Sequence, residues 1–416
     1  MLVATTTMLI PLSIQNEKDY MISIRRDLHA HPELSFQEHR TAASIAALLR
    51  EMPGISDVIE GVGRTGVTAL IRGGSSGPCV LLRADMDALP LTETGDCPFI
   101  SQNIGVHHAC GHDGHCAALL GAARVLGSRA AGMRGVVKLC FQPAEEGYGG
   151  ARFMIKDGIL DQTDTSPQVD YVFGAHLWTY MPIGTVGARS GAMMAGSDKF
   201  TLSVVGKGGH AAAPQSTVDA IVTASHLVTA LQTVVSRSVD PLEPAVLSCC
   251  IIKGGSGYNV ICDRVDLSGT VRAFSEATQG VVQARMGEIC AGVGSTFGAE
   301  IAMDYVRGYP PTINSHPIQL AQLRAAARAI VGEENKVKED TITCGAEDFS
   351  YFLQKRPGAF FFVGAAIEGQ PLRPHHRSDF DFDERALEIT AAIWVRLIHD
   401  LLGGGEKDWP QSSTAK

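Results

Sequence analysis

The sequence predicts an α/β protein with a mostly parallel sheet flanked by helices, into which a second, α+β domain is inserted. Two observations support this prediction. In the first half of the chain and again near its end, short apolar runs alternate with helical patterns, which is typical of a largely parallel sheet. Between these two regions the elements follow a different order, which indicates a separate domain.

The main domain is predicted from its apolar runs. Residues 17–50 have a helical pattern that Pro32 interrupts, because proline cannot continue a helix. A further helix is expected from about Gly114 to Ser128. Four buried strands are expected, at residues 79–82, 136–141, 171–173 and 360–363.

The middle of the chain is predicted to form the inserted domain. Its expected elements are a strand at 200–205, a helix at 220–235, strands at 246–252 and 265–274, a helix at 275–293 and a strand at 300–306. The order β-α-β-β-α-β is that of a ferredoxin-like unit. We therefore place the inserted domain at about 192–307, which divides the main domain into residues 1–191 and 308–416. The tail after about residue 403 begins with three glycines and is expected to be flexible.

Composition restricts the class of function. Apolar residues make up 45% and charged residues 19%, as in soluble globular proteins, and no apolar run is long enough for a transmembrane helix. The net charge of −9 argues against nucleic acid and against anionic membrane surfaces as partners. Most of the ten cysteines stand singly in apolar surroundings, which fits reduced thiols in the cytoplasm. Residues 1–14 make a poor signal peptide.

Side chains that bind metals or move protons stand at the ends of the predicted elements. Those just past strand ends or just before a helix are Asp85, Asp87, Cys110, His112, Glu145, Glu146 and His176. Because the carboxyl ends of parallel strands share one edge of a sheet, we expect these side chains to converge there. Each has a plainer explanation when taken singly: a carboxylate can cap a turn or lie in solvent, and a histidine can belong to the core.

The combination fits a metal-assisted hydrolase. Thiolate, imidazole and carboxylate ligands can hold two divalent ions, and these donor types suit Zn²⁺, Mn²⁺, Co²⁺ or Ni²⁺. One further carboxylate must stay off the metals and take the proton of the attacking water. The adjacent Glu145 and Glu146 offer one carboxylate for each task. Next to a cation, Cys110 would be a thiolate at neutral pH.

The motifs in this order and spacing resemble the M20 metallopeptidase family, in particular its amidohydrolase branch. That branch includes hippurate hydrolases, indole-acetyl-amino-acid hydrolases and N-acetyl-diaminopimelate deacetylases, and it implies a phosphorylase/hydrolase-like catalytic domain. The matching segments run nearly end to end: 26–34, 84–90, 108–115, 141–146, 208–212, 259–261, 269–272 and 345–350.

The resemblance implies roles in the metal centre. Cys110 would bridge or flank two metal ions, and Asp87 would orient a ligand. Glu145 would be the general base and then the acid that protonates the leaving amine. The last ligand would be His376, four residues before Phe380, with its neighbour His375 as the alternative. The remaining ligands would be His112, Glu146 and His176.

The resemblance also gives the inserted domain a role. In the family this domain forms dimers, so a homodimer or higher homo-oligomer is expected. His210, in a Gly-Gly-His turn, would help to hold the carbonyl oxygen or the substrate carboxylate, often across the dimer. Asn259 and Arg272 would line the same cleft, and arginine suits a carboxylate. Without the resemblance, His210 reads as a surface turn residue.

Several residues depart from the family pattern. His107 stands where methionine is usual, Gln215 replaces a common histidine, and Cys262 replaces a common proline. These departures affect the substrate pocket more than the reaction. The remaining histidines are expected to be structural or exposed: His29, His31, His39, His115, His226, His316 and His399.

The leading hypothesis is the hydrolysis of a small N-acyl or N-aroyl amino acid to a carboxylic acid and a free amino acid. A dipeptidase or aminopeptidase of the wider family is the second hypothesis. A metal-bound binding protein without catalysis is the third, and the intact Glu145 argues against it.

Overall fold

The computed structural model describes residues 8–332 and 336–403, and the chain divides into two compact units. Unit 1 contains the residues up to Gly191, Ile313–Thr341 and the residues from Tyr351 onward. Unit 2 contains Ala192–Thr312 and Ile342–Ser350. The tail after residue 403 and the first seven residues lie outside the described part of the chain. No described helix is long and apolar enough to cross a membrane.

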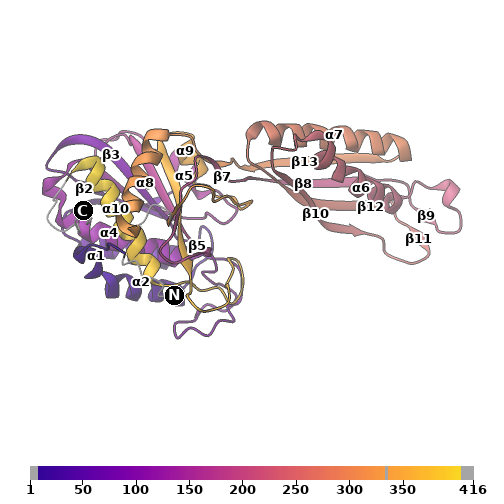
Figure 1. Cartoon of the computed structure of the whole chain (residues 1–416). Coiled ribbons are helices and arrows are strands. Elements are labelled where there is room, and N and C mark those ends of the chain that lie inside the picture. The colour runs from indigo at the N-terminus through magenta and orange to yellow at the C-terminus, as the bar shows by residue number, and fades with distance from the viewer. Residues whose placement is uncertain (1–7, 333–335, 404–416) are drawn as a thin grey trace, which may run out of the picture. The chain divides into compact units, whose positions relative to one another are not determined.

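Unit 1 is built on an eight-stranded sheet with the order β1-β2-β4-β3-β5-β16-β6-β15. Figure 1 labels β2, β3 and β5 of this sheet. The four neighbours β4, β3, β5 and β16 are parallel, whereas β1, β2 and β6 pair antiparallel at the sides. The strands are β1 Ile55–Val62, β2 Gly66–Arg72, β3 Ser75–Asp85, β4 Arg134–Gln142, β5 Tyr171–Pro182, β6 Val186–Gly187, β15 Val337–Lys338 and β16 Gly358–Ala366. This mixed α/β fold with a large, mostly parallel sheet confirms that part of the predicted fold class.

Helix α4 (His112–Ser128) is the central helix of unit 1. Fifteen of its 17 residues are buried, because it packs against the sheet as well as against α2 and α10. The apolar Leu119, Leu120 and Ala123 belong to the same core as Trp394 of α10. The other helices are α1 Leu12–Gln15, α2 Lys18–Ala30, α3 His39–Glu51, α5 Gly150–Lys156, α8 Pro317–Val331, α9 Ser350–Leu353 and α10 Arg385–Leu402.

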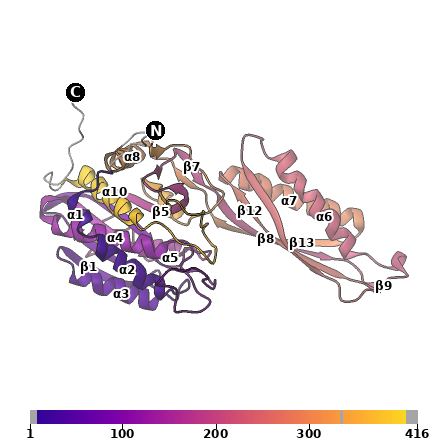
Figure 2. The ribbon, with the colours of Figure 1, turned by 60° about the horizontal axis from the view of Figure 1, so that its bottom comes forward.

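Unit 2 contains an antiparallel sheet with the order β10-β12-β8-β13. Helices α6 and α7 pack against each other and cover one face of this sheet (Figure 2). Along the chain the elements follow the order β8 Gly196–Val205, α6 Ala220–Ser238, β10 Ala245–Gly254, β12 Arg264–Ala273, α7 Glu276–Phe297 and β13 Glu300–Tyr309. Two short pairs are also present: β9 Gly209–His210 with β11 Val260–Ile261 in unit 2, and β7 Gly191–Met194 with β14 Thr312–Asn314 at two points where the chain passes from one unit to the other.

The strands next to the candidate site are longer than predicted. The prediction that Asp85 and His176 follow strand ends is wrong: Asp85 is the last residue of β3, and His176 lies inside β5. Polar residues misled the prediction, because Arg83 and Asp85 are fully buried and pair with each other within the strand. The strands β1 and β2 were not predicted.

Candidate metal centre

Two histidines of unit 1, His112 and His176, both leave their Nε2 atom available at the same site. The Nδ1–H group of His112 donates to the carbonyl oxygen of Asp87 at 2.8 Å, and that of His176 donates to the carbonyl oxygen of Leu177 at 2.6 Å. A carbonyl only accepts, so both rings carry their proton on Nδ1 and leave Nε2 for a cation. Backbone carbonyls commonly orient metal-binding histidines in this way. Cys110 joins them, with its Sγ atom 3.4 Å from Nε2 of His176.

The strand register explains why His176 belongs here although β5 continues beyond it. Strands β3 and β5 are parallel, with Arg83 opposite Gly174. Two residues further on, Asp85 and His176 therefore lie level with each other. Strand β3 ends at Asp85, so His176 lies at the shared carboxyl edge while its own strand runs on to Pro182.

The turn after β4 directs two adjacent carboxylates toward this edge. Ala144 has a φ of +54°, a left-handed conformation that is uncommon for a residue other than glycine. The carboxylate of Glu38 accepts the Ala144 N–H group at 2.9 Å. The carboxylate of Asp87 accepts the N–H groups of Glu145 and Glu146, each at 3.0 Å. These bonds hold the turn from two sides.

Asp87 organises more of the centre than the sequence indicated. Its carbonyl oxygen fixes the ring of His112, and its carboxylate holds the backbone of the two glutamates and accepts a hydrogen bond from Ser35 at 2.6 Å. It is 1% exposed. The predicted role of Asp87, to orient a ligand, fits these contacts.

His376 and His375 differ in what they contact. Nε2 of His376 lies 3.2 Å from a carboxylate oxygen of Glu146, and the ring is half exposed. His375 is instead stacked on Trp178, with ring centres 4.7 Å apart, and its Nε2 accepts the N–H group of Thr179 at 3.3 Å. Both histidines therefore lie beside proposed ligands, because the ring centre of His375 is 5.3 Å from that of His176, but only His376 places a ring nitrogen next to the carboxylate of Glu146.

The ligand atoms form overlapping groups, in each of which all atoms lie within 4.8 Å of one another. At this edge they include Cys110 with His112 and His176, Cys110 with Glu146 and His376, and His112 with Glu145 and Glu146. Cys110, His112 and Glu146 each belong to two of these three groups, as expected of ligands of two neighbouring ions. A further group contains Asp85, His112 and His115. Nε2 of His112 is buried and has no hydrogen-bond partner among the described residues. The residues thus fit a metal site by geometry and by donor type.

His115 is close by but does not fit a ligand role. Its Nδ1–H group donates to Asp85 at 2.5 Å, and its Nε2 accepts the N–H group of Leu177 at 2.9 Å. Both nitrogens are therefore occupied, which agrees with the expectation that His115 is structural.

The electrostatics of the centre favour positive charge. Burial raises the pKa of the Cys110 thiol well above its ordinary value, and the carboxylates of Glu146 and Glu145 raise it further. Burial alone would lower the pKa of His112, but Asp85 and Asp87 outweigh it and raise that pKa to about 10. Without a metal ion the centre therefore holds protons on both groups, and a cation would replace them.

Sequence reasoning missed two supporting residues. Glu38 holds the Ala144 turn, but its partners are distant in the chain and nothing local marks it. Arg83 binds Asp85 at 2.7 Å and Gln142 at 2.9 Å. An arginine inside an apolar strand pattern indicates a buried ion pair, so the sequence did contain a sign of this contact.

The candidate substrate residues of unit 2 fall into two places. His210 and Asn259 lie together on the β9–β11 pair, where the Asn259 carbonyl oxygen accepts the Ala211 N–H group at 3.1 Å, and both residues are exposed. Strand β11 comes just before the first residue of β12. Arg272 lies near the last residue of β12, opposite Ser197 of β8. The ten residues of β12 span roughly 30 Å. Within one unit 2, Arg272 is therefore far from His210.

Thiolate, imidazole and carboxylate groups gathered at the edge of a mostly parallel sheet define the class of metal-dependent hydrolases with an α/β fold. The chain belongs to peptidase family M20/M25/M40, whose family model matches residues 81–400.

Similar proteins cover almost the whole chain. Thermostable carboxypeptidase 2 of Saccharolobus solfataricus is 39% identical over 394 residues, which are 94% of this chain and 96% of that protein. Hippurate hydrolase of Campylobacter jejuni is 37% identical over 390 residues, 93% of this chain and 97% of that protein. Among solved structures, the Bacillus subtilis YXEP protein, a dinuclear metal binding peptidase from the M20 family, has a TM-score of 0.79 and 33% identity. This match covers 93% of this chain and 99% of that one.

Proposed function

We propose that this chain hydrolyses the amide bond of N-acyl or N-aroyl amino acids to a carboxylic acid and an amino acid. The observation that carries the proposal is the set of overlapping ligand groups in which Cys110, His112 and Glu146 are shared. Two divalent ions, of Zn²⁺, Mn²⁺, Co²⁺ or Ni²⁺, would be held by Cys110, His112, Glu146, His176 and His376.

Bound divalent ions supply polarisation of the amide carbonyl and acidification of water. Glu145 takes the proton of the attacking water and delivers it to the nitrogen of the leaving amino acid. This glutamate is buried and belongs to the same group as His112 and Glu146. Asp87 fixes the backbone N–H groups of both glutamates and thereby holds the turn from which the two side chains extend.

Two observations support N-acyl and N-aroyl amino acids as the substrate class. A carboxypeptidase and a hippurate hydrolase both release an amino acid that has a free carboxylate, and both are similar to this chain over most of its length. Beside His176 lies an aromatic group in which Trp178 stacks on Phe362 with ring centres 4.4 Å apart. Tyr180 extends it at 5.2 Å from Trp178. Phe362 is buried, so the partly buried Trp178 and the exposed Tyr180 are the residues that we propose to contact an aroyl or other apolar acyl group.

Unit 2 is proposed to be an inserted ferredoxin-like domain that closes over the substrate and forms a homodimer. Its order β-α-β-β-α-β and its antiparallel four-stranded sheet support the first part. The separation of His210 from Arg272 within one unit supports the proposal of a homodimer. If both residues serve one substrate, two chains must contribute them. We further propose a cytoplasmic location, in keeping with ten free cysteines among the described residues.

A direct assay tests the proposal. Purified protein is loaded in turn with each of the four metal ions and incubated with benzoyl-glycine, with acetylated amino acids and with dipeptides that have a free amino group. We expect hydrolysis of the acylated substrates and much slower hydrolysis of the dipeptides. Preference for a free amino group would favour a dipeptidase or aminopeptidase. Tight binding without turnover under every metal would contradict the enzyme hypothesis.

A further inference from the structure

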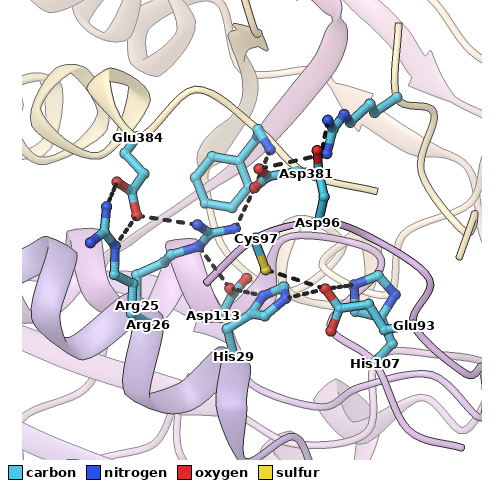
Figure 3. Close-up of polar contacts among 12 residues, drawn as sticks. Arg25, Arg26, His29, Glu93, Asp96, Cys97, His107, Asp113, Asp381 and Glu384 are labelled. Atoms are coloured by element: carbon cyan, nitrogen blue, oxygen red, sulfur yellow. Dashed lines mark hydrogen bonds and ion pairs between the residues drawn. The ribbon is translucent and has the colours of Figure 1, made fainter. Parts of the chain in front are cut away.

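A second group of metal-binding side chains lies in unit 1, and it includes none of the five proposed ligands (Figure 3). His29 lies in α2, whereas Glu93, Cys97 and His107 belong to the segment between β3 and α4. Ligand atoms of His29, Glu93 and Cys97 all lie within 4.8 Å of one another. Nε2 of His107 lies 3.6 Å from Oε1 of Glu93.

Three distances from Oε1 of Glu93 are close to the edge lengths of a tetrahedral site. Nε2 of His29 lies at 3.2 Å, Sγ of Cys97 at 3.5 Å and Nε2 of His107 at 3.6 Å from this oxygen. Ligand atoms around a tetrahedral Zn²⁺ ion are about 3.3 to 3.6 Å apart, given bond lengths of about 2.0 to 2.3 Å. Two imidazoles, a thiolate and a carboxylate form a ligand set that a borderline-soft divalent ion prefers.

Neighbouring groups already orient these ligands. The Nδ1–H group of His29 donates to the carboxylate of Asp113 at 2.8 Å, which leaves Nε2 facing Glu93. Arg25 holds the same carboxylate oxygen of Asp113 at 3.1 Å. The other oxygen of Glu93 accepts the Ser101 N–H group at 2.7 Å. Oε1 itself accepts hydrogen bonds from Nε2 of His29 at 3.2 Å and from the Cys97 thiol at 3.5 Å, so it becomes available to a cation when these two groups lose their protons. A carboxylate behind a histidine is the usual support of a metal-binding imidazole.

His107 supplies an independent observation. Its side chain is fully buried, and neither ring nitrogen has a hydrogen-bond partner in the described part of the chain. A buried polar group without such a partner costs free energy, so its presence needs an explanation. A cation bound through Nε2 would satisfy this residue.

We propose that His29, Glu93, Cys97 and His107 bind one Zn²⁺-like divalent ion, separate from the catalytic centre, that fastens the segment 91–106. This segment forms no helix or strand and leads to Cys110. Segments of this length without secondary structure usually need another constraint. When the ion binds, the thiol proton of Cys97 and the Nε2 proton of His29 pass to solvent. The thiolate and the carboxylate then balance the charge of the ion.

A metal count tests the proposal as a difference between variants. Metal-free protein is saturated with Zn²⁺, freed of excess by gel filtration and measured by elemental mass spectrometry. Wild type should retain one equivalent more than Cys97→Ser and one more than His107→Met, whatever the occupancy of the catalytic centre. Cys250→Ser, which changes an exposed thiol of unit 2, should retain as much as wild type. Equal counts in wild type, Cys97→Ser and His107→Met would overturn the proposal.

A spectroscopic measurement separates the two thiolates. Cys110→Ala removes the thiolate of the catalytic centre, so a thiolate-to-cobalt charge-transfer band in the Co²⁺-loaded variant must come from another cysteine. We expect this band in Cys110→Ala and its loss in Cys110→Ala combined with Cys97→Ser. The combination of Cys110→Ala with Cys250→Ser should keep it. Absence of the band in folded Cys110→Ala, verified by circular dichroism, would exclude Cys97 as a ligand.

Discussion

The metal centre of unit 1 and the candidate substrate residues of unit 2 differ in how firmly the chain holds them. Asp87 and His112 are buried and bound to several neighbours. His210 is exposed, and its ring accepts a hydrogen bond from the N–H group of Ala212, two residues along the chain. The centre of unit 1 is thus oriented before any ligand arrives, as fixed catalytic groups require. The residues of unit 2 are placed by short strand pairing, and a substrate or a second chain must complete their surroundings.

The largest expected effect concerns the proton transfer inside unit 1. Glu145→Gln should lower kcat on benzoyl-glycine by roughly 10²–10⁴-fold, because the attacking water loses its base. Metal content should stay that of wild type. Glu146→Gln is the matched control at the adjacent position, and it should lose metal as well as activity. Full activity of Glu145→Gln on every hydrolysed substrate would show that another group takes the proton.

The corresponding change in unit 2 should affect substrate and leave the metals in place. His210→Ala should lower kcat/KM by roughly 10²–10³-fold, the usual effect of losing a group that stabilises the developing oxyanion. Metal content and melting temperature should not change, because the ring is exposed. His226→Ala, which alters another exposed histidine of unit 2, should keep wild-type kinetics.

Mixing inactive variants tests whether His210 acts across a dimer. His210→Ala and Glu145→Gln chains, unfolded together and refolded, would form mixed dimers in which one site has both intact residues. Recovery of a part of the wild-type activity is expected. If His210 acts within its own chain, the mixture should remain as inactive as either variant alone.

Local sequence signals explain how much of the fold was predictable. The strands β3, β4, β5 and β16 contain continuous apolar runs, which a single pass along the chain detects. Strand β1 is half exposed and mixes polar residues with apolar ones, so no run marks it. The ends of the strands were harder to predict. The charged Arg83 indicated the end of a strand, because its ion pair with Asp85 is apparent only in the folded structure.

The centre was predictable only where topology and motif agreed. Parallel strands bring Asp85, Glu145 and His176 to one edge without any family knowledge. His376 lies far along the chain from Glu146, and only the resemblance indicated it before the structure brought the two within 3.2 Å. The role of each ligand stays a prediction until a metal is bound. The departure at His107 was assigned to the substrate pocket, whereas the structure places it beside Glu93.

A smaller effect is expected from the residue that orients the centre. Asp87→Asn weakens the carboxylate contacts to the backbone of Glu145 and Glu146, so metal affinity should fall by roughly 10–100-fold. Activity at saturating metal should fall less than in Glu145→Gln. Asp170→Asn is the control, because Asp170 also accepts a backbone N–H group, that of Cys79, at the opposite ends of the strands. Unchanged metal affinity in Asp87→Asn would mean that the carboxylate of Asp87 does not orient the metal ligands of unit 1.

The smallest effect concerns the support behind the Ala144 turn, and it appears as a dependence of stability on pH. Glu38 is fully buried, and burial, with a contribution from the charge of Asp87, raises its pKa from 4.5 to about 7. A raised carboxyl pKa means that the folded chain binds the proton more tightly than the unfolded chain. This contribution to the free energy of unfolding is complete below pH 4.5 and is lost as pH rises through 7. Its upper limit is about 3 kcal/mol.

Glu38→Gln should remove this dependence, because the amide does not titrate, while its oxygen can still accept the Ala144 N–H group. Urea unfolding at pH 5 and pH 8 should therefore show the variant gaining stability relative to wild type at the higher pH. Glu51→Gln, at the other end of the same helix and exposed, should follow wild type. Parallel pH profiles of wild type and Glu38→Gln would mean that Glu38 is already charged at pH 5. The Ala144 turn before Glu145 would then be held by a buried, charged carboxylate. The metal ligands of unit 1 would in that case be oriented at a cost in the free energy of unfolding.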